Sequence, residues 1–280
     1  MFRQDVSVPR CLSAKQPSDR GAPPRASKSK SDMTPEKTVV YSATTRNSQL
    51  LADGAKDIVA AFAQHHIWIT MALHDIRMRY RGSILGPWWI TLSMGFLIAG
   101  MSVLYASLMN LELKAYVPWL ACGIVVWGLI TSTLTEGCDA FIGGGPIIRQ
   151  SATPIFTFVL RTLTRNLMVF GHNVVIVAVV AVIFGFWKDI RPFEVLLGLA
   201  AVLANLSWIV ALIALASARF RDVPQIVASI LQIALFLTPV FWHTEQLPGR
   251  PAILWLNPFY YLLEVIRAPL VGVATNTDAW

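Results

Sequence analysis

The sequence Arg77-Met78-Arg79-Tyr80-Arg81 is followed by thirty residues, Gly82–Leu111, that include no charged side chain. This run is longer than the roughly 20 residues that a helix needs to cross the hydrocarbon core of a membrane. Each of the three arginines would cost about 2.5–3.5 kcal/mol at the bilayer centre, so we expect them to mark the edge of the membrane. Because basic residues favour the inside of the cell, that edge is expected to face the cytoplasm.

The composition extends this expectation to the whole chain. Of its 280 residues, 55% are hydrophobic and 14% are charged, whereas soluble domains carry about 25% charged residues. The apolar runs are continuous and do not alternate, which favours helices over a transmembrane β-barrel. We therefore expect an all-α polytopic membrane protein. The net charge of +7 comes from the tail and the membrane edges, so it does not indicate a nucleic-acid-binding face.

Two segments precede the first span. Residues 1–56 are rich in Ser, Pro, Lys and Arg, a composition typical of a disordered basic tail, here on the cytoplasmic side. Residues 57–82 carry apolar side chains at steps of three and four residues, which predicts an amphipathic helix in the membrane interface. The positions on this face are Ile58, Phe62, His65, Ile69, Leu73, Ile76 and Tyr80.

Residues 83–280 form a predicted transmembrane domain with five spanning helices. These are expected at about Leu85–Met109, Val117–Cys138, Asn166–Trp187, Val195–Ser217 and Val223–Trp242. A further apolar stretch, Pro251–Leu263, has only 13 residues and is too short to span, so we expect a re-entrant segment over residues 251–270. The few polar residues inside the spans leave two interpretations open, interhelical hydrogen bonds or a polar path. They are His172, Asn173, Asn205 and Gln232.

The distribution of basic residues supports a cytoplasmic amino terminus. With that orientation, the basic tail, the interface helix and the inside loops all lie on the cytoplasmic side, as the positive-inside tendency requires. The inside loops then hold Arg149, Arg161, Arg165, Arg219 and Arg221, and the outside segments hold Lys114, Lys188, Arg191, Arg250 and Arg267.

Motifs for chemistry are missing from the sequence. It holds no G-x-x-x-x-G-K-[ST] phosphate loop, so the chain is not expected to hydrolyse ATP or to act as an enzyme. No spacing of His, Cys or carboxylates indicates a metal site. The acids nearest to a span, Glu136 and Asp139, lie at the inner end of the second helix and not mid-membrane, where ion coupling would place them. An external energy source is therefore expected.

The loop between the second and third spans, residues 139–158, is cytoplasmic in this arrangement. It carries the helix breakers Gly143-Gly-Gly-Pro146 and Pro154 on either side of an apolar and basic middle. A short helix that docks on a partner and a plain connecting loop remain equal alternatives from the spacing alone.

The junction after the interface helix resembles the opening of ABC-2 type permeases that export polysaccharide. The signature of that family is an interface helix ending in Arg-x-Arg-Tyr-Arg, followed by Leu-Gly-x-x-Trp at the start of the first span. The matching residues here are Arg77, Arg79, Tyr80, Arg81, Leu85, Gly86 and Trp89. By this resemblance, the same region borders the entrance for the substrate.

Further motifs of the family follow in its order, and the resemblance covers about Asp57 to Gly272. These motifs are Glu136-Gly-Cys-Asp-Ala-Phe141, Ile148-Arg-Gln150, Arg219-Phe-Arg-Asp-Val-Pro-Gln225, Thr238-Pro-Val-Phe-Trp242 and Asn257-Pro-Phe-Tyr-Tyr261. The resemblance implies a coupling segment that contacts the ATPase and a cytoplasmic turn before the fifth span. The coupling residues are Glu136, Asp139, Arg149, Gln150 and Pro154, and the turn residues are Arg219, Arg221 and Asp222.

The resemblance also implies the partners and the cargo. Two copies of the chain form a homodimer around a channel in the bacterial inner membrane, and separate nucleotide-binding ATPase subunits dock on its cytoplasmic side. ATP and Mg²⁺ bind to that partner, so no cofactor is expected on this chain. The cargo is a lipid-linked, O-antigen-like glycan that enters from the cytoplasmic leaflet. Capsule and teichoic-acid exporters are near relatives.

One departure from the family leaves alternatives open. The family normally has a sixth spanning helix and a cytoplasmic carboxyl end, whereas this sequence ends at Trp280, 13 residues after Arg267. We therefore expect the sixth span to be absent. A small-molecule ABC-2 exporter and a shortened inactive subunit or scaffold are the alternatives to a polysaccharide permease.

Overall fold

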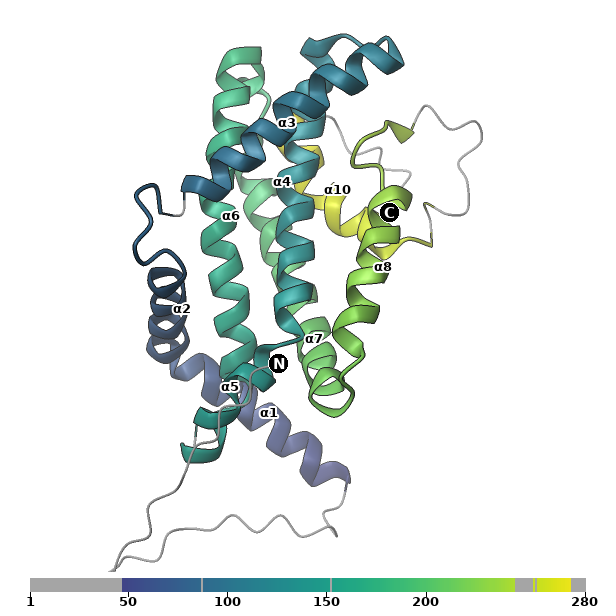
Figure 1. Ribbon diagram of the computed structural model, residues 1–280. Helices are drawn as coiled ribbons and strands as arrows, with labels where there is room; N and C mark the ends of the chain where they lie inside the picture. The colour runs from purple at the N-terminus through teal and green to yellow at the C-terminus, as the bar shows by residue number, and fades with distance from the viewer. Residues whose placement is uncertain (1–46, 87, 152, 245–253, 255, 273–280) are drawn as a thin grey trace, which may run out of the picture. The chain divides into compact units, whose positions relative to one another are not determined.

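The computed structural model describes residues 47–86, 88–151, 153–244, 254 and 256–272, and within them every regular element is a helix (Figure 1). The predicted all-α fold is confirmed. In chain order the helices are α1 (Asn47–Ala63), α2 (His65–Arg79), α3 (Trp88–Met109), α4 (Leu113–Gly137), α5 (Ala140–Gln150), α6 (Phe156–Phe184), the short 3₁₀ helix η1 (Phe186–Lys188), α7 (Pro192–Arg219), α8 (Val223–Leu237) and α10 (Pro258–Val271).

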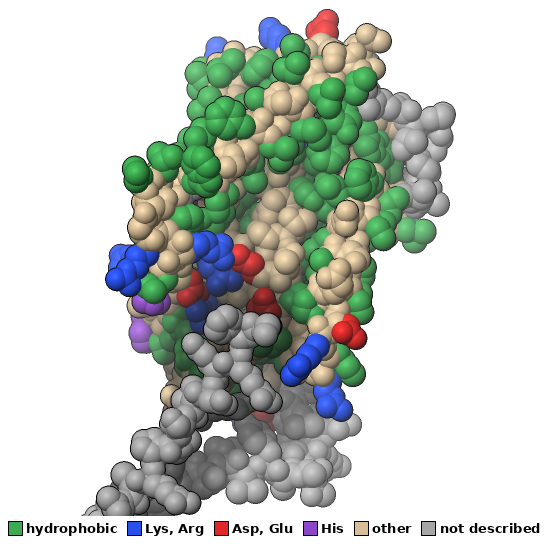
Figure 2. Space-filling view, in the orientation of Figure 1, with side chains coloured by type: hydrophobic (Ala, Val, Ile, Leu, Met, Phe, Trp, Pro, Cys, Tyr) green, Lys and Arg blue, Asp and Glu red, His purple; other side chains and the backbone are tan. Residues whose placement is uncertain are grey.

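Four helices, α3, α4, α6 and α7, are long and apolar enough to cross a membrane, and they confirm four of the five predicted spans. Figure 2 shows hydrophobic side chains over much of this face, with Lys, Arg, Asp and Glu gathered toward its two ends. The fifth predicted span forms as α8, but its 15 residues rise only about 22 Å, less than the roughly 30 Å of a hydrocarbon core. This helix ends where Pro239 drives the preceding residue, Thr238, into an extended conformation with ψ 135°.

Helix α6 begins at Phe156, well before the start expected for the third span at Asn166. Its 29 residues rise about 43 Å, and the part without charges, Asn166–Phe184, accounts for about 28 Å of that length. This uncharged part alone matches the thickness of the hydrocarbon core. The additional turns include Arg161 and Arg165, which is why hydrophobicity alone placed them outside the helix.

The predicted interface helix consists of two helices. Between α1 and α2, Gln64 leaves the helical region with φ −94° and ψ 41°. The indole N–H of Trp68 donates to the carbonyl oxygen of Ala61 across this break, at 3.2 Å. The structure thus differs from the expected division of the chain in two ways: residues 47–56 are helical, and residues 57–82 are not one continuous helix. The rest of the predicted tail, residues 1–46, lies outside the described part.

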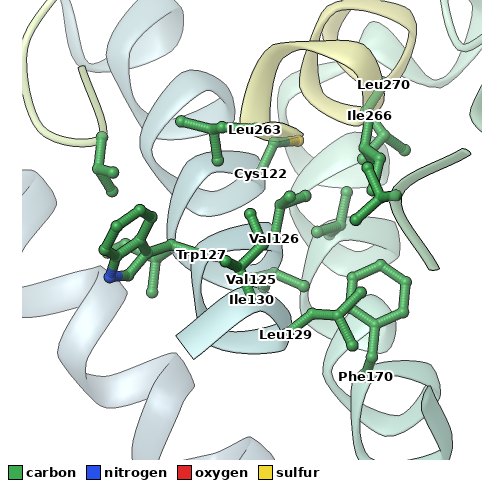
Figure 3. Close-up of a cluster of buried hydrophobic side chains, with 14 of the residues drawn as sticks. Cys122, Val125, Val126, Trp127, Leu129, Ile130, Phe170, Leu263, Ile266 and Leu270 are labelled. Carbon is green, nitrogen blue, oxygen red and sulfur yellow. The ribbon is translucent and has the colours of Figure 1, made fainter. Parts of the chain in front are cut away.

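Helix α4 lies at the centre of the packing, in contact with α3, α6, α7 and α10. It is buried along most of its length, whereas the other three spanning helices leave wide apolar faces exposed, as expected for surfaces that meet lipid or a second subunit. Figure 3 shows side chains of α4 gathered between Phe170 of α6 and three side chains of α10. The labelled residues are Cys122, Val125, Val126, Trp127, Leu129, Ile130, Phe170, Leu263, Ile266 and Leu270.

Helix α10 corresponds to part of the predicted re-entrant segment, of which residues 251–253 and 255 lie outside the described residues. It begins after Asn257, whose side chain accepts a hydrogen bond from the backbone N–H of Phe259 at 3.0 Å, and its first residue is Pro258. With 14 residues it rises about 21 Å and is too short to span.

Arg267 of α10 is fully buried, although the sequence suggests a charge in an outside segment. Its Nη1 donates to the carbonyl oxygen of Pro239 at 2.6 Å, and its Nε donates to Glu264 at 3.1 Å. The guanidinium lies 3.5 Å from the centre of the Trp119 ring in α4. A buried arginine is tolerated here because its charge and its donors are satisfied.

One polar residue inside the spans makes the expected interhelical hydrogen bond. The hydroxyl of Thr91 in α3 donates to Oδ1 of Asn173 in α6 at 3.1 Å, and both side chains are buried. The amide of Asn205 instead donates to the carbonyl oxygen of Ala201 in its own helix, at 3.0 Å. The first interpretation is therefore confirmed for Asn173 alone among these residues.

Candidate functional site

Five charged side chains from three helices meet beside α2. They are Asp75 and Arg79 of α2, Glu136 of α4, and Arg161 and Arg165 of α6, and we refer to them as the ion network. The two members on α2 are four residues apart, as are the two on α6, so each pair lies on one face of its helix. The network therefore joins the helix that precedes the first span to two spanning helices, at the last turn of α4 and the first turns of α6.

Asp75 is held by both arginines of α6. Arg161 forms a two-pronged pair with it: Nε donates to Oδ2 at 2.7 Å and Nη2 donates to Oδ1 at 2.5 Å. Arg165 adds a third bond from Nη1 to Oδ2 at 3.0 Å. Parallel bonds of this kind fix the orientation of both partners as well as their distance.

Glu136 of α4 accepts hydrogen bonds from the other two helices of the site, α2 and α6. Arg79 of α2 donates from Nη2 to Oε1 at 2.7 Å. Arg165 donates from Nε to Oε2 at 2.9 Å, and its Nη2 lies 2.7 Å from the same oxygen. The amide of Asn166 donates to Oε2 at 2.9 Å. Arg165 thus bridges the two carboxylates and closes the network.

The network is mostly withdrawn from solvent. The side chains of Asp75, Arg161, Arg165 and Glu136 are 14%, 22%, 15% and 23% exposed, whereas that of Arg79 is 41% exposed. At this burial, removing one partner leaves a charge without compensation, and the loss is larger than for a surface ion pair.

The pKa values on α2 reflect these contacts. Burial acts to raise the pKa of Asp75, but the hydrogen bond from Arg161 and the charges of Arg161 and Arg165 outweigh it, and the pKa lies below its ordinary value of 3.8. Burial raises the pKa of Tyr80, whose hydroxyl is enclosed beside the network. Asp75 is therefore ionised at neutral pH, and Tyr80 is neutral.

A second attachment joins α1 to the start of α6. The carboxylate of Asp57 accepts hydrogen bonds from the backbone N–H groups of Ile155 and Phe156, at 3.0 and 2.9 Å. These donors belong to the first turn of α6, where no partner within the helix exists, and the helix dipole favours a negative charge. The rings of Phe62 and Phe156 lie 6.2 Å apart beside this contact. The joint between α5 and α6 is thereby fixed to α1.

The segment between the second and third spans contains a helix, α5, so it is not a plain connecting loop. Gly144 faces Phe158 of α6 so closely that an added Cβ would lie 2.5 Å from the ring. Ile142 and Ile147 of the same helix are 51% and 41% exposed. An exposed apolar pair on a short helix beside the ion network is a surface suited to protein docking.

A model of the ABC-2 type transporter family matches residues 67–271, a range that runs from α2 to the end of α10. The chain belongs to this family. It is therefore a multi-pass membrane protein, and its family consists of transport permeases that work in a complex with a separate ABC ATPase subunit.

Curated relatives match the permease over about two thirds or more of each chain. The O-antigen export system permease protein RfbA of Myxococcus xanthus is 24% identical over 207 residues, which cover 71% of this chain and 78% of the relative. The O-antigen export system permease protein RfbA of Klebsiella pneumoniae is 22% identical over 202 residues, which cover 66% of this chain and 72% of the relative.

In the permease, the residues predicted at the substrate entrance lie in different environments. Arg79 lies in the ion network and Tyr80 beside it, whereas Arg77 and Arg81 are exposed. Gly86 has a positive φ of 56° in the turn that leads to α3, a conformation that favours glycine. Trp89, in the first turn of α3, is 58% exposed.

The predicted coupling residues are also divided. Glu136 lies in the ion network, while Asp139 and Gln150 are exposed at the two ends of α5. Arg149 lies in the last turn of α5, and Pro154 is buried before α6. The turn residues Arg219, Arg221 and Asp222 are exposed between α7 and α8. Of all these predicted residues, the ion network brings together Arg79 and Glu136.

Sequence reasoning did not identify Asp57, Asp75, Arg161 or Arg165 as site residues. A signal was present for the last three, because Asp75 and Arg79, and Arg161 and Arg165, are pairs at a spacing of four residues. Two arginines on one face of an otherwise apolar helix require acidic partners. No comparable signal marks Asp57, since its partners are backbone N–H groups ninety-eight and ninety-nine residues away.

Proposed function

We propose that this chain is the transmembrane permease subunit of an ATP-driven exporter that moves a lipid-linked, O-antigen-like polysaccharide across the bacterial inner membrane. The observation that carries the proposal is the family match over residues 67–271, because it takes in the helix of the ion network, the docking helix α5 and all four long spans. The names of the relatives support the choice of cargo.

The energy comes from a separate ATPase subunit in this proposal. Helix α5 is the coupling helix, and its exposed residues Ile142 and Ile147 bind to that subunit. A displacement of α5 reaches α6 directly at their joint, α1 through Asp57, and α2 and α4 through the ion network. Helices that are joined by such contacts move together, because charged pairs with a fixed geometry resist sliding of one helix along another.

The remaining parts of the proposal concern assembly and orientation. Two copies of the chain form a homodimer around the channel, with the amino terminus, the ion network and α5 on the cytoplasmic side. Arg77, Arg79, Tyr80, Arg81, Gly86 and Trp89 border the entrance for the lipid-linked glycan. ATP and Mg²⁺ are bound by the partner subunit, and this chain holds no cofactor.

The proposal is tested by Ile147→Glu, which places a charge in the centre of the docking surface. We expect the variant to insert at the normal level, while the amount of co-purified ATPase and of glycan at the cell surface each fall more than about tenfold, as for a central contact in an interface. The matched control is Leu256→Glu, since Leu256 is 81% exposed and lies just before α10, a helix that packs against α4 and α7.

Three results would contradict parts of the proposal. Normal glycan export by the Ile147→Glu variant would show that α5 is not the docking surface. Loss of the whole chain with unchanged surface glycan but new sensitivity to drugs would point to a small-molecule cargo. ATP hydrolysis that is the same with and without the chain would point to an inactive subunit.

A further inference from the structure

Helix α2 carries polar side chains on two opposite faces. The inward face holds Asp75 and Arg79 of the ion network. The outward face holds His66, Thr70, His74 and Arg77, which follow one another at steps of four, four and three residues. At about 100° per residue these four lie within a quarter of the circumference, roughly half a turn away from the inward face.

All residues of this outward face are exposed, and Arg81 continues it in the turn after α2. We call His66, Thr70, His74, Arg77 and Arg81 the outer basic face. Figure 2 shows Lys or Arg side chains next to His side chains along the edge that α2 forms in Figure 1. Within the described part of the chain, the ion pairs of this region are made by Asp75 and Arg79, and neither Arg77 nor Arg81 takes part in one.

The packing of α2 defines its depth in a membrane. Asp75 contacts Arg161 and Arg165, which belong to the turns of α6 that precede its uncharged part. Because Asn166–Phe184 already matches the roughly 30 Å hydrocarbon core, the turns before it extend into the headgroup layer. Helix α2 is held against these turns and therefore lies at headgroup depth.

We propose that the outer basic face binds the phosphate groups of anionic membrane phospholipids in the leaflet where α2 lies. This inference goes beyond the transport function: it requires that the chain spans a membrane, and it does not depend on the cargo or on the ATPase. The lipid contact stabilises the outward face of α2, and the ion network stabilises its inward face. The lipid composition therefore determines how strongly α2 is held in its position.

The extent of the face favours a row of headgroups over one ligand. From His66 to Arg77 it runs about 17 Å along the helix, and Arg81 lengthens it further. Apolar side chains flank it, with Leu73 39% and Met78 51% exposed, as expected where a helix lies between headgroups and acyl chains. A docked soluble protein would instead be expected to meet a polar rim.

The test measures lipid binding by the full-length chain in a neutral detergent, by native mass spectrometry with added phosphatidylglycerol or phosphatidylcholine. We expect a clear preference for phosphatidylglycerol in the wild-type chain. The double variant Arg77→Gln/Arg81→Gln should bind phosphatidylglycerol roughly thirtyfold more weakly, about fivefold for each arginine near an anionic surface. Raising the salt concentration should weaken the wild-type binding, because exposed charges are screened.

The matched control is Lys114→Gln/Lys188→Gln, which removes two exposed basic residues at the other ends of α4 and α6. It should leave the preference for phosphatidylglycerol unchanged. Equal binding of the two phospholipids, or an unchanged affinity in the Arg77/Arg81 variant, overturns the proposal. Binding of a polyprenyl diphosphate but not of phosphatidylglycerol, lost in the same variant, also overturns it and assigns the face to the headgroup of a single lipid diphosphate.

Discussion

Arg165 shows how one residue can determine the arrangement of three helices. It lies between Asp75 and Glu136 and donates to both, so that α2 and α4 are held at the same position on α6. The sequence makes such a pairing plausible, because Arg165 lies one turn from Arg161 and needs acidic partners in an apolar helix. It does not identify the partners, since Asp75 is ninety residues away and six acids precede the loop between α5 and α6 in the described chain.

Asp75 gives a prediction about pH. Its pKa is lower in the folded chain than its ordinary value of 3.8, so it stabilises the fold at pH values above that value, and the contribution is lost as the pH falls through the lower, folded-state pKa. At pH 7 we expect Asp75→Asn to lose about 1–3 kcal/mol of stability, as for a buried charged hydrogen-bond partner. Thermal unfolding of the detergent-solubilised chain, followed by tryptophan fluorescence, measures the difference.

This difference between wild-type chain and variant should shrink below pH 3.8, because the carboxyl of the unfolded wild-type chain then binds a proton while that of the folded chain is still ionised. Asp139→Asn is the control, since Asp139 is exposed and should show little difference at any pH. If the difference in stability between the wild-type chain and Asp75→Asn stays constant down to pH 2, the charge of Asp75 is not the source of the stability.

At the scale of elements, the joint between α5 and α6 is held by contacts from both α1 and α5. Asp57 of α1 binds the first N–H groups of α6, and Gly144 of α5 lies directly against Phe158. The sequence predicted α4 and α6 but left the segment of α5 between them undecided, because three glycines and a proline argue against a helix. Packing against α6 and α7 overrides that local preference.

The Asp57 contact is tested by hydrogen exchange. In Asp57→Ala, the amides of Ile155 and Phe156 lose their acceptor, and we expect them to exchange at least about tenfold faster, corresponding to a loss of 1.4 kcal/mol or more. Asp53→Ala is the control, because Asp53 is on the same helix and pairs with the exposed Lys56. Equal protection of these amides in both variants would exclude the cap.

Two neighbouring glycines of α5 are expected to change the stability in opposite directions when each is replaced by alanine. A Cβ at position 144 would lie 2.5 Å from the Phe158 ring, whereas nothing lies within 4 Å of one at position 145. Gly144→Ala should therefore destabilise the chain by about 1–3 kcal/mol through overpacking. Gly145→Ala should stabilise it by up to about 1 kcal/mol, because alanine is the better helix former. Thermal unfolding of the two variants distinguishes them, and equal shifts would mean that α5 does not pack on Phe158.

At the scale of the whole molecule, the four long spans could be predicted and the places of several charged side chains could not. Continuous apolar runs predicted the four long spans, since hydrophobicity and length are sufficient for that purpose. Counting basic residues by loops failed for Arg161, Arg165 and Arg267, which all lie within helices. Their places depend on acidic partners, backbone oxygens and an aromatic ring that the fold brings together.

The proposed orientation is tested by labelling single cysteines in intact cells with a membrane-impermeant reagent. The described cysteines Cys122 and Cys138 are buried, and Cys11 is replaced by serine in the background. We expect Gln150→Cys, at the end of α5, to react only after the membrane is opened. Lys188→Cys, after α6, should react in intact cells. The reverse pattern would place the amino terminus outside the cell.

The order of residues in the ion network has a consequence for biosynthesis. Because a ribosome makes the chain from its amino end, Asp75 and Glu136 are both synthesised before the two arginines that they bind on α6. When α6 emerges, its Arg161 and Arg165 meet carboxylates that already stand at the membrane. At the membrane edge each arginine costs less than the about 2.5–3.5 kcal/mol of the bilayer centre, but without a partner it would be a buried charge that nothing compensates. The longest helix in the described part of the chain can therefore be placed with its two arginines already paired at the membrane edge.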